Sequence, residues 1–115
     1  MSRDWTVQLE DIRKAVGKIR RYIASLDYSA FSNDPKTQDA VLRNLDIIGE
    51  GARVLPDTIK ARASEVEWRK IAALRNMLLH EYFGISMPIV WDIVCNKLDE
   101  LDKACERLLR GENRS

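Results

Sequence analysis

The chain has 115 residues, of which 45% are hydrophobic and 32% are charged, with 19 lysines and arginines against 18 aspartates and glutamates. This size and composition suit one folded domain with its own core, and exclude a disordered chain. The net charge of +1 excludes nucleic-acid binding driven by overall positive charge. The single histidine excludes a site that needs two histidines from one chain.

Apolar residues at helical spacing predict two long helices in the first half of the chain. The first stripe covers residues 5–26, with steps of four and three residues. A turn is expected over residues 29–33. Asp34 and Pro35 then predict a helix start, with Asp34 as the N-cap and Pro35 in the first helical position. The second stripe covers residues 41–55.

The second half of the chain predicts a short helical piece and two further long helices. Residues 56–62 begin with a proline and leave room for one short helical piece. A third long helix is expected to begin near Glu67 and to end before Gly84. Ser86 can cap a last helix, whose apolar stripe covers residues 90–108.

We therefore expect an all-α fold, an up-and-down four-helix bundle with an additional short helix. Residues 1–115 form its single domain, and residues 111–115 are a polar, frayed tail. Some apolar residues lie outside the main stripes: Ile47, Ile89, Trp91 and Ile93. They exceed what one side of a small bundle buries, which predicts a homodimer formed by helices.

The cysteines and the hydropathy pattern indicate where the chain functions. Cys95 and Cys105 are expected on one helix, about 15 Å apart, too far for a disulfide. They are expected to be free thiols in a reducing compartment. No apolar segment approaches the roughly 18 residues of a membrane span, and the first residues lack the apolar part of a secretory signal. We expect a cytoplasmic protein that does not contact a membrane.

The segment Leu-Arg-Asn-Met-Leu-Leu-His-Glu-Tyr-Phe-Gly, residues 74–84, holds the only histidine and several polar residues. Asn76 and His80 share one face of a regular helix. Arg75 and Tyr82 share a neighbouring face. Arginine offers a charged fork that matches phosphate oxygens, and histidine can move a proton near neutral pH.

This pair of residue types suits metal-independent cleavage of RNA, in which the ribose 2′-hydroxyl attacks the adjacent phosphorus. His80 would act as base or acid, and Arg75 would stabilise the charge that develops on the phosphate. One histidine cannot easily be both base and acid, and a two-fold dimer would supply a second. A purely structural role is the alternative, because a histidine cation near a helix C-terminus complements the helix dipole.

A basic run over residues 13–21 contains five cationic residues and no acidic one. It is expected mainly on the side of the first helix away from the apolar stripe. Four of its residues are candidate contacts to RNA phosphates: Arg13, Lys14, Lys18 and Arg21. The alternative is a solvated helix face without a ligand.

Asp46 and Glu50 lie one turn apart on the second predicted helix and could be read as paired carboxylates for a metal ion. No further ligand pattern accompanies them. Solvated or ion-paired carboxylates are therefore the favoured reading, and we predict neither a metal nor a cofactor.

The segment Arg-Asn-Met-Leu-Leu-His-Glu-Tyr-Phe resembles the RxxxxHxY motif of HepT-like toxins, a family of the HEPN superfamily of helical ribonucleases. The resemblance covers almost the whole chain in the expected order. It includes residues 4–12, residues 36–45, Ile47-Ile48-Gly49-Glu50 with Ala52, Trp68-Arg69 and Val90-Trp91. Gly51 departs from it, since the family more often has alanine there, and residues 63–65 replace a segment that usually carries a proline.

The resemblance implies a HEPN-like homodimer with the motif at the subunit interface, active as a metal-independent endoribonuclease. Arg75 and His80 would be its catalytic pair, and Asn76 would orient them. It also implies the toxin of a type VII-like toxin–antitoxin module. The antitoxin would be a minimal nucleotidyltransferase that transfers AMP from ATP to Tyr82, and the added bulk and negative charge would oppose RNA binding.

A second function class stays open beside the toxin. The chain could be a non-catalytic helical subunit that binds or regulates a separate nucleotidyltransferase and cuts no RNA. A helical bundle with a spare apolar face would serve that role as well. Only an activity measurement separates the two hypotheses.

Overall fold

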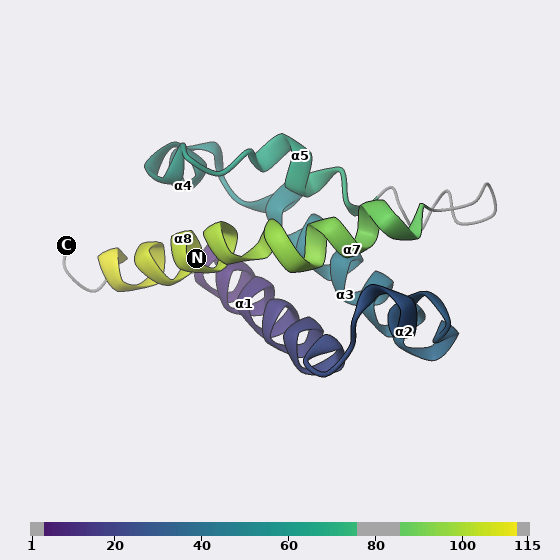
Figure 1. The fold of residues 1–115 in the computed structure, drawn as a ribbon. Coiled ribbons are helices and arrows are strands. Elements are labelled where there is room, and N and C mark those ends of the chain that lie inside the picture. Colours follow the sequence, from purple (N-terminus) through teal and green to yellow (C-terminus); the bar gives the residue numbers. More distant parts are fainter. Residues whose placement is uncertain (1–3, 76–85, 113–115) are drawn as a thin grey trace.

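The computed structural model describes residues 4–75 and 86–112 (Figure 1). Over these ranges the chain forms helices and no strand, which confirms the expected all-α fold. The elements are α1 (Asp4–Ile23), α2 (Tyr28–Ser32), α3 (Pro35–Val54), α4 (Asp57–Lys60), the 3-10 helix η1 (Ala61–Ala63), α5 (Trp68–Ala72), α7 (Met87–Asn96) and α8 (Leu98–Glu112). No helix within these ranges is long and apolar enough to cross a membrane.

The helices α1, α3 and α8 supply most of the core. α1 packs along α3 and also against α8, while α5 packs against α3. Figure 1 shows α7 and α8 following one another across the molecule, with α1 on one side of them and α5 on the other. The most deeply buried side chains include Leu9, Ile12 and Ile19 of α1, Leu45 and Ile48 of α3, and Leu98 and Leu101 of α8.

Both predicted helix starts with a polar cap are confirmed. The Asp34 carboxylate accepts hydrogen bonds from the Thr37 backbone N–H at 3.2 Å and from the Thr37 hydroxyl at 2.6 Å, and Pro35 occupies the first helical position. The Ser86 hydroxyl accepts a hydrogen bond from the Ile89 N–H at 3.4 Å. These bonds satisfy N–H groups that a helix leaves without a partner in its first turn.

The turn expected over residues 29–33 is wrong, because this segment forms the short helix α2. Asp27 caps it by accepting a hydrogen bond from the Ala30 N–H at 2.8 Å. Phe31 is fully buried and lies against Trp91 of α7, with 5.0 Å between the ring centroids. A buried aromatic contact distant in sequence therefore holds a segment that local signals place in a turn.

The single last helix is also wrong, since the chain breaks between α7 and α8 at Lys97. The two halves pack on different partners: α7 contacts α2, and α8 contacts α1. The break lets each half follow its own partner, which a single straight helix could not do. Cys95 and Cys105 consequently lie on two helices, Cys95 exposed and Cys105 buried. Burial raises the pKa of the Cys105 thiol to about 12, so this thiol stays protonated at neutral pH.

The apolar residues expected to be spare divide into two groups. Ile47 is 37% exposed and Ile89 is 56% exposed. Trp91 and Ile93 are partly buried against the chain's own core. Part of the apolar surface that suggested a dimer is thus used within one chain, and the homodimer stays a prediction.

Gly49 allows the segment after α5 to approach α3 very closely. A Cβ atom at this position would lie 2.6 Å from the Arg75 backbone nitrogen and 3.2 Å from the Ala72 carbonyl oxygen. Both are backbone atoms, which cannot move aside as a flexible side chain can. The absence of a side chain at Gly49 therefore decides how close Arg75 stands to α3.

We expect the substitution Gly49→Ala to lower the free energy of unfolding by about 1–3 kcal/mol, because the new methyl group collides with backbone. The matched control is Gly17→Ala. At Gly17 a Cβ would meet only the Arg21 Nη1 atom at 3.9 Å. Gly17→Ala should therefore raise the stability by about 0.5–1 kcal/mol. Urea unfolding of the three proteins measures both changes, and equal effects of the two substitutions would contradict the close contact.

Candidate functional site

Arg75 is the one residue of the predicted motif that the structure describes. The other three, Asn76, His80 and Tyr82, lie outside the described residues. The described part of the site therefore consists of Arg75 and the surfaces of the helices around it. Arg75 follows α5, whose first residue, Trp68, is buried and donates a hydrogen bond from Nε1 to the Ala63 carbonyl oxygen at 3.0 Å.

The Arg75 side chain is held by Glu50 on the outer face of α3. The Arg75 Nε atom lies 3.2 Å from Glu50 Oε1. Arg53 fixes the same carboxylate by two hydrogen bonds, Nε to Oε1 at 3.0 Å and Nη2 to Oε2 at 2.8 Å. Glu50 therefore joins two arginines, and it contacts Arg75 through the Nε atom.

The charges around Glu50 keep this arrangement intact at neutral pH. The hydrogen bond from Arg53 first, and the charge of Arg75 in addition, lower the pKa of Glu50. A carboxyl group with a lowered pKa in the folded state stabilises the fold above its unfolded pKa. That contribution is lost only as the pH falls through the lowered value. The ion pair is therefore present at neutral pH.

Arg75 is also accessible to a ligand. Its side chain is 45% exposed and that of Glu50 is 42% exposed. Gly49 brings the backbone of Arg75 against α3, and Glu50 then fixes the guanidinium at the surface. A cation that is both exposed and held in place suits the binding of a phosphate group.

The reading of Asp46 and Glu50 as a metal site finds no support in these contacts, because Glu50 is engaged with two arginines. Within residues 4–75 and 86–112, no group of three or more histidine, cysteine, aspartate or glutamate residues is placed to hold a metal ion. The absence of a metal from the function stays a prediction.

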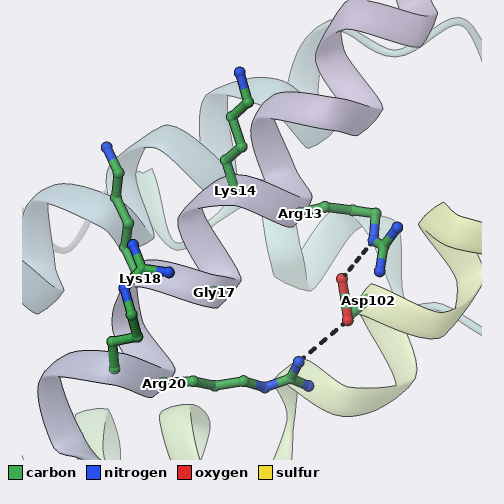
Figure 2. A pocket seen from close by; sticks show the side chains of 7 residues that line it. Arg13, Lys14, Gly17, Lys18, Arg20 and Asp102 are labelled. Carbon is green, nitrogen blue, oxygen red and sulfur yellow. Dashed lines mark hydrogen bonds and ion pairs between the residues drawn. The ribbon is translucent and has the colours of Figure 1, made fainter.

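The basic run on α1 does not form one uniform face. Arg13 and Arg20 turn toward α8, and both contact Asp102: Arg13 Nε lies 2.9 Å from Oδ1, and Arg20 Nη1 lies 3.1 Å from Oδ2. Figure 2 shows these two arginines reaching toward Asp102, while Lys14 and Lys18 extend away from it. The run lies mainly away from the apolar stripe, as expected, since Lys14, Lys18 and Arg21 are exposed, but Arg13 and Arg20 also contact α8.

Asp102 is the centre of the contact between α1 and α8. Its side chain is only 14% exposed, and each of its oxygens accepts from a different arginine. Arg20 also pairs with Asp99, one turn earlier on α8. The hydrogen bond to Asp102 raises the pKa of Arg13. Arg20 was not among the sequence-derived contacts, and no local signal distinguishes it from its neighbours in the run.

Comparison with known proteins assigns the fold to a family. A profile of the family described as "Ribonuclease HepT-like" matches residues 12–108. The chain is 35% identical to "Probable ribonuclease HepT" of Thermococcus cleftensis, over 94% of this chain and 98% of the relative. It is 37% identical to a "Putative RNase" of Methanocaldococcus jannaschii, over 89% of this chain and 84% of the relative. No solved structure matches the chain.

The unequal roles of the two acidic residues on α8 lead to a stability prediction. Asp102→Asn should lower the free energy of unfolding by about 1–2 kcal/mol, because two arginines lose the charge of a mostly buried partner. Asp99 is 72% exposed, and Asp99→Asn should cost only about 0.5 kcal/mol. Urea unfolding at low and high salt measures both losses. Equal losses would contradict the central position of Asp102.

Proposed function

Because the chain belongs to the HepT-like ribonuclease family, we propose that it is a ribonuclease that cuts within RNA chains and needs no metal ion. The observation that carries the proposal is the arrangement at Arg75, an exposed guanidinium fixed through its Nε atom by a charged glutamate. Relatives that align over nearly their whole length bear ribonuclease names, which supports the same activity.

The proposed reaction divides its work between two residues. The ribose 2′-hydroxyl attacks the adjacent phosphorus, the bond from phosphorus to the 5′-oxygen breaks, and a 2′,3′-cyclic phosphate forms. His80 takes the proton of the attacking hydroxyl or delivers one to the leaving 5′-oxygen. The terminal nitrogens of Arg75 stabilise the negative charge that builds up on the phosphate, and Asn76 orients the pair.

A homodimer follows from the need for two proton-transfer groups at one phosphate. The chain has one histidine, so a second His80 has to come from a second copy. Exposed apolar residues such as Ile47 and Ile89 offer surface for such a contact. In this proposal the motifs of two subunits face each other across the two-fold axis.

The biological role that we propose is that of a toxin in a type VII-like toxin–antitoxin module in the cytoplasm. Its partner is a minimal nucleotidyltransferase that attaches AMP to Tyr82. The added phosphate carries negative charge next to Arg75 in the motif and so opposes the binding of an RNA phosphate.

The catalytic proposal predicts that the purified protein cuts single-stranded RNA equally well with and without EDTA. Arg75→Ala and His80→Ala should each lower kcat by at least a hundredfold, because each removes a group that acts in the transition state. Glu50→Gln should lower kcat by a smaller factor, about threefold to tenfold, because Arg75 then keeps its place less firmly. The cleavage assay uses end-labelled RNA with a reading of the terminal phosphate.

Two controls make the result decisive. An RNA with a 2′-deoxy sugar at the cleavage position should stay intact, since the attacking hydroxyl is missing. Lys36→Gln, far from the motif in sequence and exposed on α3, should cut as the unchanged protein does. Loss of cleavage in EDTA would overturn the metal-free mechanism. A folded protein that cuts no RNA but binds a nucleotidyltransferase would favour the non-catalytic subunit.

The regulatory proposal predicts that co-expression with the proposed nucleotidyltransferase partner, or incubation with it and ATP, adds whole AMP units to the chain. Intact mass spectrometry measures the addition, and the modified protein should lose RNA cleavage. Tyr82→Phe should abolish the addition. Tyr22→Phe and Tyr28→Phe are matched controls, since both tyrosines are exposed, at 40% and 37%. Modification that persists in Tyr82→Phe would overturn the assignment.

A further inference from the structure

The basic residues of α1 surround a hollow centred on Gly17. Its lining consists of the five basic residues of the run, Gly17 and Asp102, and its volume is about 370 Å³. A Cβ atom at Gly17 would have no neighbour closer than 3.9 Å, so the missing side chain leaves the floor of the hollow open. Figure 2 shows Gly17 on α1 together with the two arginines that reach toward Asp102 and the two lysines, Lys14 and Lys18, that extend away from it.

The hollow exposes positive charge and little negative charge. Its one carboxylate, Asp102, is 14% exposed and accepts from Arg13 and Arg20 through both oxygens. Within the described ranges, no ion pair engages Lys14, Lys18 or Arg21. These three side chains are exposed and free to contact an anion. The hollow therefore has arginines paired with Asp102 on one wall and exposed cations without a described ion-pair partner on the other.

We propose that this hollow, defined as the basic hollow, binds the sugar–phosphate backbone of RNA at a docking site separate from Arg75. The proposal rests on the proposed ribonuclease function for the identity of the nucleic acid. Neither Arg75 nor Glu50 lines the hollow. Arg75 packs on α3 next to α5, whereas the hollow lies between α1 and α8.

The geometry of the charges favours a chain of phosphates over a single anion. The cations without an ion-pair partner among the described residues run from Lys14 to Arg21, about 10 Å along the helix axis. Successive phosphates of one strand match this row better than a single phosphate does. Among the described residues, the lining contains no aromatic side chain on which a base could stack. The contact is therefore made to the backbone and is independent of sequence.

A membrane surface is the other polyanion to consider, and the structure favours RNA over it. A helix that lies on a membrane inserts an apolar face into the lipid. The apolar stripe of α1 is instead buried in the protein core, with Leu9, Ile12 and Ile19 fully buried. The described residues that line the hollow include no apolar side chain.

The test measures the binding of a fluorescent 2′-O-methyl RNA of 20 nucleotides to the full chain, because this RNA lacks the attacking hydroxyl and cannot be cut. Lys14→Gln with Lys18→Gln should weaken binding at least fivefold at 0.1 M salt. The slope of log K against log salt should become shallower by about 1.4, the value for two lost phosphate contacts on a single strand. The control pair Lys36→Gln with Lys60→Gln removes the same charge elsewhere on the surface and should weaken binding less than twofold.

A second series tests the hollow itself at constant charge. Gly17→Leu fills the floor and should weaken binding at least fivefold, whereas Gly17→Ala should bind as the unchanged protein does. Circular dichroism and thermal unfolding verify that each variant folds.

Three outcomes would overturn the proposal: equal losses in the two lysine pairs, unchanged binding by Gly17→Leu, or tighter binding to vesicles with anionic lipid than to RNA. Failure of the ribonuclease function is distinguishable from these outcomes. In that case unmodified RNA stays intact while the 2′-O-methyl RNA still binds at the hollow.

Discussion

The contact between Gly49 and the backbone of Arg75 is the constraint on which the candidate site depends. With 2.6 Å between a would-be Cβ and the Arg75 nitrogen, any side chain at position 49 would push the segment after α5 away from α3. Glu50 could then no longer reach the guanidinium at 3.2 Å. One missing side chain thus sets both the packing of the helices and the position of the exposed cation.

Asp102 plays the corresponding part on the other side of the bundle. Its carboxylate pairs with Arg13 and Arg20 of α1, and these two ion pairs hold α8 against α1. Without it, two guanidinium groups that repel each other would face α8 with only the exposed Asp99 between them. The acidic last helix, a poor surface for RNA in itself, is therefore what gives the basic hollow its fixed wall.

The parts of the fold that local chemistry determines could be predicted, and those that depend on distant contacts could not. The Asp34 cap follows from residues within one turn, and the structure has it as expected. The helix α2 depends on Phe31 meeting Trp91, sixty residues later, and the break at Lys97 depends on two different packing partners. The sequence indicated that Arg75 is a functional cation, but it did not indicate which acidic residue pairs with it. Nothing in the sequence links Arg75 to Glu50.

The two cationic sites differ in how firmly their charges are held, and this difference suits different tasks. A guanidinium that Glu50 already holds loses little conformational freedom when a phosphate arrives, so it can act on one defined atom. Lys14 and Lys18 have no ion-pair partner among the described residues and can follow phosphates at varying positions, at some cost in entropy for each contact. A cation that an acidic partner holds in place therefore suits catalysis at one bond. Cations without such a partner suit binding along an RNA strand of any sequence. A near-neutral protein can have both, because the acidic partners Glu50 and Asp102 fix the arginines, while Lys14 and Lys18 pair with no acidic residue in the described part of the chain.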